Sequence, residues 1–309
     1  MIKKNKKQTI DMAWGSPSFL DFYWHKKRLP QIERASRTKN YAVGSRKLLR
    51  SKIKNLHKKV KNAETKDRHI VVAAGATQII LGLFHVLREE AYGCSAYAQP
   101  PHFSRFPMLA NLSNLDWYND RLGGIKVVTN PNNPDGRVSN PTEATILDLC
   151  YNWPQYTDVI MYDHPIMVFS LSKATGHANT RIGWALIKDK VIAKKLEHYI
   201  EVSTGGLSID SQVKAEKIIE TQLRLKNTVF SYGKKILDSR WDRIKKIKHL
   251  LPFEVLNESG MFLWAKGTCP EYLISLKGEA SGGTYENFRL NIGCSERKFK
   301  AALKLLVDG

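Results

Sequence analysis

Short runs of apolar, mostly β-branched residues alternate with amphipathic segments through the middle of the chain. Residues 69–74 (HIVVAA) predict a buried strand, and the apolar spacing of residues 77–90 (TQIILGLFHVLREE) predicts a helix that follows a turn at Gly75. Further short strands are predicted at residues 92–97, 114–118, 125–129, 145–149, 166–170 and 182–187. Strands that alternate with helices favour a largely parallel sheet covered by helices.

The pattern changes after residue 188, where long helical periodicities replace the short apolar runs. Single helices are predicted over residues 190–202 and 208–236, strands over 253–256, 261–265 and 287–292, and a final helix over 295–306. This part of the chain therefore indicates a second, smaller α+β unit. The first forty residues are too basic and too short to form a core, and we expect them to lie over one of the two units.

Composition places the chain among ordinary globular proteins. It has 309 residues, of which 42% are hydrophobic and 25% charged, so it can bury a sizeable core and is neither disordered nor a disulfide scaffold. Its four cysteines, Cys94, Cys150, Cys269 and Cys294, stand singly, which argues against a zinc or redox motif. The basic N-terminus lacks the apolar run of a signal peptide, and no stretch reaches the ~20 apolar residues of a membrane span. We expect a cytoplasmic protein without a membrane-spanning segment.

The charge balance raises the question of an anionic partner. The 49 Lys+Arg exceed the 29 Asp+Glu and give a net charge of +20, which can attract nucleic acid, membranes or small anions. The basic residues are spread over residues 3–7, 26–28, 52–61 and 243–249, and the spacing of Lys54, Lys58 and Lys61 is typical of the solvated face of a helix. No nucleic-acid-binding motif accompanies them, so nucleic acid is a disfavoured partner.

The most informative segment is residues 170–185, SLSKATGHANTRIGWA. Lys173 leaves a predicted strand there, and burial at a strand end would lower the pKa of its amine and make the amine usable for a Schiff base. Ser170 and Arg181 would supply a hydroxyl and a bidentate cation that suit a phosphate.

Three other clusters gain meaning beside that lysine. Residues 130–136 (NPNNPDG) are by themselves an ordinary turn, Asp148 and Tyr151 follow a predicted strand, and residues 74–78 (AGATQ) begin a helix whose free N–H groups suit a phosphate. Pyridoxal 5′-phosphate requires a lysine for its aldehyde, an acid for its pyridine nitrogen and donors to its phenolic oxygen. The four clusters together supply all of these.

These motifs resemble the fold-type-I pyridoxal-phosphate enzymes, and within them the branch of alliinases and plant tryptophan aminotransferase-related proteins. Residues 15–24 (GSPSFLDFYW) are similar to that branch's N-terminal G-D-P-x-x-x-E-x-Y-W segment, and YNWPQYT at 151–157 and SKATGHANTRIGWA at 172–185 follow in the family's order. The resemblance implies an aminotransferase-like α/β fold, with a mostly parallel seven-stranded sheet in a large domain, helices on both faces, and a smaller α+β domain. We place the large domain at 41–205, and the N-terminal segment and small domain at 1–40 and 206–309.

The resemblance also assigns roles to residues. Lys173 would form the Schiff base and move the proton at the substrate Cα, Asp148 would pair with the pyridinium nitrogen, and Tyr151 would bond the ring oxygen together with Asn133. The other cofactor-binding residues implied are Gly75, Ala76, Thr77, Phe103, Ser170, Arg181 and, across a dimer interface, Tyr41. Arg289 would bind the substrate α-carboxylate, with Asn133 and Gly15 beside the substrate. Ordinary packing could also explain Phe103, a surface position could explain Arg289, and Asp163 is a rival for the acid.

The implied function is a pyridoxal-phosphate-dependent aminotransferase acting on an L-amino acid and a 2-oxo acid, as a homodimer with a shared active site. An aromatic amino acid is one candidate substrate. A C–S β-lyase of the alliinase kind would use the same residues. We prefer transamination because the alliinases' cysteine-rich module is absent from the sequence. Ser16 replaces the acid that usually follows Gly15, which argues against an exact alliinase substrate. A non-catalytic nucleic-acid-binding protein is a third alternative, which has no need for Lys173, Asp148 and Arg289 together.

Overall fold

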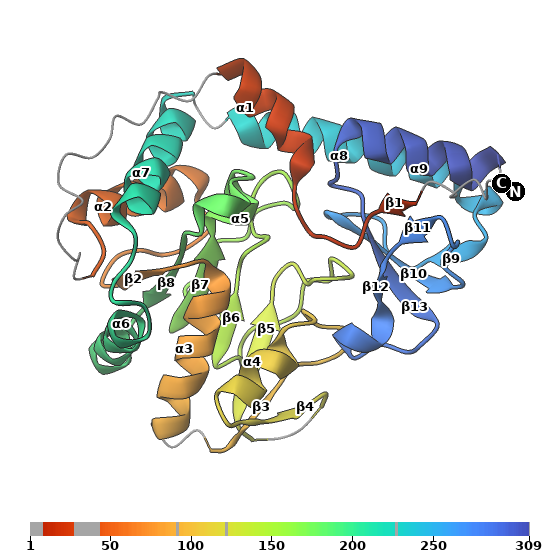
Figure 1. Ribbon diagram of the computed structural model, residues 1–309. Coiled ribbons are helices and arrows are strands. Elements are labelled where there is room, and N and C mark those ends of the chain that lie inside the picture. The colour runs from red at the N-terminus through yellow and green to blue at the C-terminus, as the bar shows by residue number, and fades with distance from the viewer. Residues whose placement is uncertain (1–8, 28–43, 91–92, 121–122, 226–227, 309) are drawn as a thin grey trace, which may run out of the picture.

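The large sheet has seven strands, and one of them runs against the others (Figure 1). The computed structural model describes residues 9–27, 44–90, 93–120, 123–225 and 228–308. The strand order is β2 (His69–Ala73), β8 (Gly183–Ile187), β7 (Ile166–Ser170), β6 (Ile146–Asp148), β5 (Ile125–Thr129), β3 (Ser95–Tyr97) and β4 (Asp116–Tyr118). Strand β8 is antiparallel to both of its neighbours, and every other pair is parallel. The predicted, mostly parallel seven-stranded sheet is confirmed.

Helices cover both faces of this sheet, because its strands carry apolar residues on both sides. On one face, Val71 and Val168 belong to a core shared with α3 (Ala76–Glu89), α4 (Phe106–Leu112) and α6 (Lys190–Thr204). On the other, Val72 and Phe169 join a core shared with α2 (Lys47–Val60) and α7 (Ile209–Arg224). Alternate residues of one strand therefore serve opposite layers, which explains the continuous apolar runs in the sequence. The α2 spacing of Lys54 and Lys58 is the exposed face of a helix, as predicted.

A four-stranded antiparallel sheet forms the centre of the second unit. Its order is β12 (Leu276–Lys277), β13 (Asn287–Asn291), β10 (Phe262–Gly267) and β9 (Phe253–Val255). Helices α8 (Thr228–Ile247) and α9 (Glu296–Asp308) lie along it, as Figure 1 shows, and η4 (Gly278–Ser281) follows β12. The apolar core continues from this sheet into one face of the large sheet. The predicted α+β unit is thus present, and it shares a hydrophobic core with the large sheet.

The first residues of the chain do more than lie over the surface, and here the sequence-based expectation is wrong. Strand β1 (Ile10–Asp11) pairs in parallel with β11 (Leu273–Ile274), and η1 (Ser18–Leu20) and α1 (Asp21–Lys27) follow it. Five apolar side chains of this segment are buried in the main core: Met12, Phe19, Leu20, Tyr23 and Trp24. The basic residues at positions 3–7 lie outside the described part of the chain. The expectation rested on the many basic residues of this segment, whereas its apolar residues determine that it is buried.

The helix predicted over residues 208–236 is also wrong, because two helices occupy this stretch. The apolar face of α7, with Ile218 and Ile219, packs toward α2. On α8, the indole of Trp241 instead donates to the Gly260 carbonyl, just before β10, at 2.8 Å. None of the helices in the described ranges combines the length and the apolar character that crossing a membrane requires.

Candidate active site

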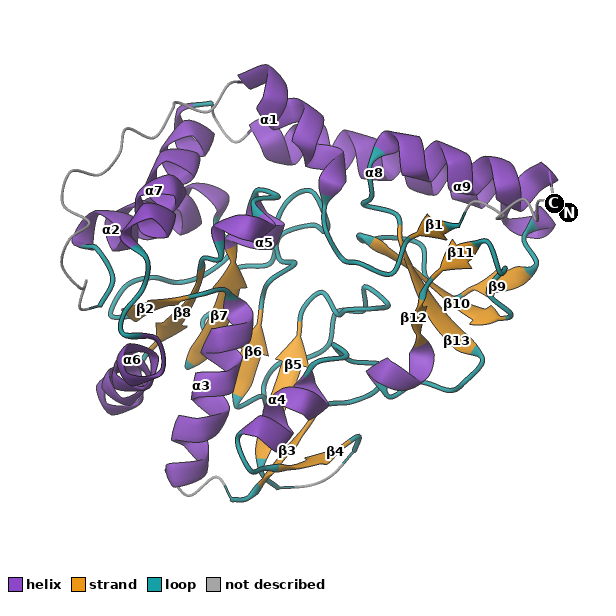
Figure 2. Ribbon diagram, in the orientation of Figure 1, coloured by secondary structure: helices purple, strands orange, loops and turns teal. Residues whose placement is uncertain are grey.

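The candidate chemical groups meet at the carboxyl edge of the large sheet. Lys173 follows β7 on the one-turn helix α5 (Leu171–Ala174), Asp148 ends β6, and Asn133 lies in the loop after β5. Because parallel strands end at the same edge, their following loops converge there. Figure 2 shows these loops between the large sheet and the four-stranded sheet.

Lys173 points its amine toward the N-terminal segment. Its Nζ donates a hydrogen bond to the carbonyl oxygen of Gly15 and lies 5.5 Å from the ring centroid of Tyr151. Ser170 caps α5, since its Oγ accepts from the Ser172 N–H at 3.2 Å. Burial of the ammonium lowers the pKa of Lys173 to about 8. A substantial fraction of this amine is therefore neutral near physiological pH.

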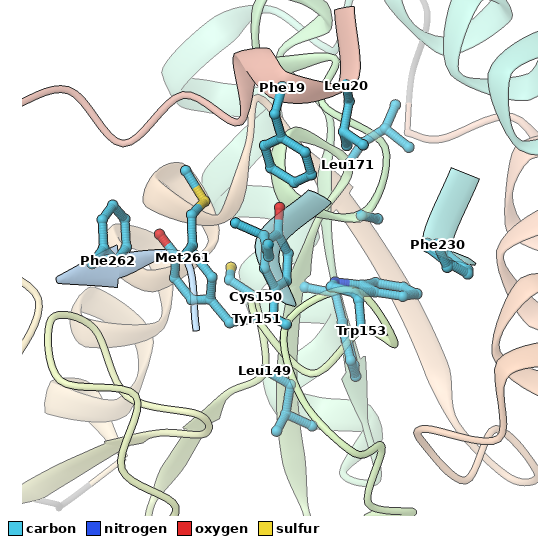
Figure 3. Packing of buried hydrophobic residues seen from close by; sticks show 14 of the residues in the cluster. Phe19, Leu20, Leu149, Cys150, Tyr151, Trp153, Leu171, Phe230, Met261 and Phe262 are labelled. Carbon is cyan, nitrogen blue, oxygen red and sulfur yellow. The ribbon is translucent and has the colours of Figure 1, made fainter. Parts of the chain in front are cut away.

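Asp148 and Tyr151 are both buried beside the lysine. Oδ1 of Asp148 accepts a hydrogen bond from the Cys150 N–H at 3.0 Å, and burial raises the pKa of its carboxyl group. Burial likewise raises the pKa of Tyr151, so that the phenol keeps its proton. Asn133 donates to the Tyr151 hydroxyl at 3.5 Å. Figure 3 shows Tyr151 in the middle of the apolar packing, near Phe262 at the start of β10.

Arg289 enters the site from β13 of the small sheet. Its Nη1 donates to Oδ1 of Asn133 at 2.8 Å and its Nη2 to the Ala13 carbonyl at 2.7 Å. The guanidinium carbon stands 4.1 Å from the ring centroid of Phe262, within the range of a cation–π contact. Burial lowers the pKa of Arg289 to about 10, which leaves the group charged at neutral pH. A buried, charged fork of this kind suits a carboxylate.

An anion cradle lies where β2 gives way to α3. Gly75 caps this helix with φ +90°, and a Cβ atom there would stand 2.5 Å from Nη2 of Arg181. Arg181 donates from Nη2 to the Ala74 carbonyl at 3.1 Å, which fixes the guanidinium beside the first turn, where Ala76 and Thr77 lie. The first N–H groups of a helix have no partners within it, and with a cation alongside they favour a phosphate.

Ser170 stands close to this cradle by strand register. It pairs with Gly183 across β7 and β8, and Gly183 pairs with Ala73 across β8 and β2. A Cβ atom on Gly183 would lie 2.3 Å from the backbone nitrogen of Ala76, so the backbones approach closely here. The structure thus brings Ser170, Arg181 and the start of α3 to one corner of the site.

Three other predicted residues have different outcomes. Phe103 lies in the loop after β3, and its ring packs edge-on against Phe106 with centroids 5.4 Å apart. Asp163 lies before β7, where its carboxylate pairs with Arg68 and Lys188, so it belongs to the opposite edge of the sheet from Asp148. Tyr41 lies outside the described residues.

Two groups at the site escaped the sequence analysis. The first is the ring of Phe262, which contacts Arg289 and stands 3.1 Å from the position that a Cβ on Gly15 would take. The second is the Ala13 carbonyl, which accepts from Arg289. Phe262 was predicted only as a strand residue, and a backbone carbonyl leaves no residue-specific signal in a sequence.

Comparisons with known proteins identify the family of the chain. The sequence model of the family described as Allinase matches residues 10–252. Tryptophan aminotransferase-related protein 2 of Arabidopsis thaliana is 34% identical over 247 residues, which cover 71% of this chain and 56% of that protein. Alliin lyase of Allium cepa var. aggregatum is 30% identical over 300 residues, covering 85% of this chain and 65% of the lyase. The chain therefore spans only part of the length of these relatives.

Solved structures show the same fold at lower sequence identity. A double mutant of Thermus thermophilus aspartate aminotransferase superposes with a TM-score of 0.79 at 15% identity, covering 99% of this chain and 93% of that one. An aminotransferase from Staphylococcus aureus gives a TM-score of 0.72 at 13% identity. The aminotransferase-like fold predicted from the motifs is confirmed.

Proposed function

The chain is a member of the allinase (alliinase) family, and from this we propose that it is an aminotransferase that acts on an L-amino acid and a 2-oxo acid. Alliinases and fold-type-I aminotransferases use pyridoxal 5′-phosphate, and so does this chain as a member of the family. The choice between transamination and lyase chemistry, and the roles of single residues, are our proposals.

The residues present fit that cofactor. Gly75 leaves free the space beside Arg181 that a larger residue would fill, which is what a phosphate cradle needs. Asp148 is a buried carboxylate with a raised pKa, so a protonated ring nitrogen would stabilise its charged form. Lys173 offers an amine with a lowered pKa for the aldehyde.

We assign the contacts accordingly. The cradle formed by Gly75, Ala76 and Thr77 would hold the phosphate, together with Ser170 and Arg181. Asp148 would bind the ring nitrogen, Tyr151 and Asn133 the ring oxygen, and Phe103 one face of the ring.

The chemistry can then be divided between the cofactor and the chain. When bound, pyridoxal phosphate supplies an electron sink that makes the proton on the substrate Cα acidic. Lys173 would take that proton as a base and return it as an acid, which a group with a pKa of about 8 can do near neutral pH. Arg289 would exchange the Ala13 carbonyl for the substrate carboxylate and so fix the orientation of Cα.

One observation supports this arrangement most strongly. Two carbonyls of the same short segment accept hydrogen bonds from the two proposed substrate-contacting groups: Ala13 accepts from Arg289, and Gly15 accepts from Lys173. The carboxylate-binding fork and the proton-transferring amine therefore face the same segment, as an α-amino acid requires. An aromatic L-amino acid is the first substrate to test, because the Phe262 ring adjoins Gly15 and the indole of Trp14 is 69% exposed.

A C–S β-lyase is the second candidate, since an alliin lyase matches 85% of the chain. Both reactions begin with removal of the Cα proton, so the same residues serve either. The test is to add single L-amino acids and S-alkyl cysteine sulfoxides to the loaded protein and follow cofactor absorbance, oxo acid and ammonia. Transamination gives one oxo acid per protomer without ammonia until a second oxo acid is added. Catalytic release of pyruvate and ammonia would overturn the proposal in favour of the lyase.

We further propose that the active unit is a homodimer in which Tyr41 reaches the phosphate of the second copy, and that it works in the cytoplasm. The dimer is supported by the exposed side chain of Arg181, because a residue of a second copy can approach the cradle there. The cytoplasm is supported by the four cysteines, all of which are free in the described residues. Sedimentation of the loaded protein at micromolar concentration tests the dimer, and a monomer of full activity would contradict it.

A further inference from the structure

The proposed catalytic lysine lies on a helix that is too short to be stable by itself. Helix α5 has only four residues, and the Thr175 N–H that follows it donates to the Leu171 carbonyl at 3.1 Å. So short a helix is unstable by itself, and its last carbonyls have no partners within it. Buried carbonyls of this kind need donors from elsewhere in the fold.

Side chains from two distant segments supply those donors. The Lys173 carbonyl accepts from the Tyr156 hydroxyl at 3.0 Å and from Nε2 of Gln155 at 2.9 Å. Nε2 of Gln155 also donates to the Ala174 carbonyl at 3.1 Å, and Nε1 of Trp24 donates to the Thr175 carbonyl at 2.7 Å. Three consecutive carbonyls, beginning at the lysine itself, are thus bound by side chains.

These side chains are themselves well fixed. Gln155, Tyr156 and Trp24 are 3%, 5% and 8% exposed, and the Tyr156 ring packs 5.6 Å from the Tyr151 ring. Burial raises the pKa of Tyr156 above its usual range, so the phenol remains a donor throughout the working pH range. Hydrogen bonds from rigid, buried donors restrict the backbone more than contacts with solvent would.

The same residues explain motifs that the proposed function leaves unused. Gln155 and Tyr156 lie in YNWPQYT at 151–157, four and five residues after Tyr151, and Trp24 ends GSPSFLDFYW at 15–24. Each motif carries one group for the cofactor or substrate site and, a few residues later, a donor to the backbone around Lys173. The short spacing links the placement of Tyr151 and Gly15 to that of the lysine.

We propose that Gln155, Tyr156 and Trp24 are positioning residues that clamp the backbone of residues 173–175 and thereby aim the Lys173 amine at the cofactor aldehyde. This proposal rests on the proposed role of Lys173. Without the clamp the amine samples more positions, so the bond to the cofactor and the proton transfer are both disfavoured, whereas the phosphate cradle and Asp148 stay as they are.

Two related ligands distinguish binding through the lysine from binding through the phosphate and ring. Pyridoxal 5′-phosphate bonds to the lysine, whereas pyridoxamine 5′-phosphate has no aldehyde and binds only through phosphate and ring. For Tyr156→Phe we expect affinity for pyridoxal phosphate to fall about five- to tenfold, with affinity for pyridoxamine phosphate unchanged. Gln155→Leu should act in the same way, and in both variants kcat should fall while KM stays constant.

Tyr272→Phe is the matched control, because it also removes one tyrosine hydroxyl that donates to a backbone carbonyl, that of Leu305 on α9 at 2.9 Å. It should leave both affinities unchanged. Equal losses for the two ligands in Tyr156→Phe, or no loss for either, would overturn the clamp. Should Tyr156→Phe fail to fold, as judged by thermal unfolding without cofactor, Gln155→Leu provides the same comparison.

Lys173→Ala distinguishes failure of the clamp from failure of the proposed function. If Lys173→Ala still binds pyridoxal phosphate in a borohydride-fixable form, the assignment of the lysine is wrong. If it does not, and Tyr156→Phe and Gln155→Leu nevertheless match the wild type for both ligands, only the clamp is wrong.

Discussion

The two walls of the candidate site are built in different ways. The wall from the large sheet consists of Lys173, Asp148 and Asn133, each in or just after a strand of one sheet. The opposite wall joins Arg289 and Phe262 of the small sheet to the Ala13 carbonyl, 276 residues from Arg289 in the sequence. Strand register brings the residues of the first wall to one edge of the sheet, and hydrogen bonds to the backbone around Lys173 add to it there. The second wall has no shared sheet and depends on hydrogen bonds between segments far apart in the chain. We therefore expect the first wall to govern cofactor chemistry and the second to govern substrate recognition.

The largest effect is expected at the first wall. Replacing Lys173 by alanine removes both the amine for the cofactor and the proton-transferring group, so kcat should fall by at least about a thousandfold. Steady-state rates with the best amino acid measure it. Lys188→Ala, on the opposite edge of the sheet, is the control, and activity of Lys173→Ala within tenfold of the wild type would contradict the assignment.

A smaller and more selective loss is expected at the second wall. Arg289→Met removes the proposed carboxylate partner and leaves Asn133 and Ala13 without their donor, so kcat/KM should fall about a hundredfold. The protein should still bind its cofactor, because the contacts that we propose for the phosphate and the ring nitrogen lie on the other wall. Arg243→Met, at a half-exposed arginine on α8, should change neither quantity. Loss of cofactor from Arg289→Met would show that the two walls are not separable.

The cradle provides a third test on the first wall. Gly75→Ala places a Cβ at positive φ and 2.5 Å from Arg181, so affinity for pyridoxal phosphate should fall about tenfold. Gly123→Ala shares the positive φ, at +93°, but has open space around the new Cβ. Equilibrium titration of cofactor fluorescence measures both variants. An equal loss of affinity in the two variants would show that backbone strain causes the effect, and would contradict the claim that the space beside Arg181 is needed for the phosphate.

The smallest expected effect is a pH dependence. The neutral amine of Lys173 is the reactive form, and burial lowers its pKa to about 8 from 10.5. The rate at which cofactor-free protein captures pyridoxal phosphate should rise about fivefold from pH 7 to pH 8 and level off above pH 9. Stopped-flow absorbance follows this rate. A rate that keeps rising to pH 10 would indicate an exposed lysine of ordinary pKa.

The contrast between the walls also describes what could be predicted from the sequence. Strands Ile125–Thr129 and Ile166–Ser170 match their predicted bounds because each is a short, mostly apolar run that ends at a polar residue. Lys173, Asp148 and Asn133 lie at or after such strand ends, so the sequence could place them at one edge of the sheet, and their roles toward the cofactor stay predictions. Short motifs around Lys173 and Gly75 carried enough information for this wall.

The second wall could not be derived in the same way. Arg289 was named through the resemblance, but its partners Ala13 and Phe262 were not, because a backbone carbonyl and a core phenylalanine have no distinctive sequence pattern. The burial of Phe19 and Trp24 was missed since the basic residues around them dominated the composition. The break between α7 and α8 was missed because helical periodicity does not say which partner each turn packs against.

The central claim is that Lys173 is the residue that holds the cofactor. Loading the protein with pyridoxal 5′-phosphate, reducing it with borohydride and mapping the digested peptides by mass spectrometry tests this directly. The account predicts one pyridoxyl group per chain, on Lys173, and its loss from that peptide when a substrate amino acid is added before reduction. A pyridoxyl group on any other lysine, or none at all, would contradict it.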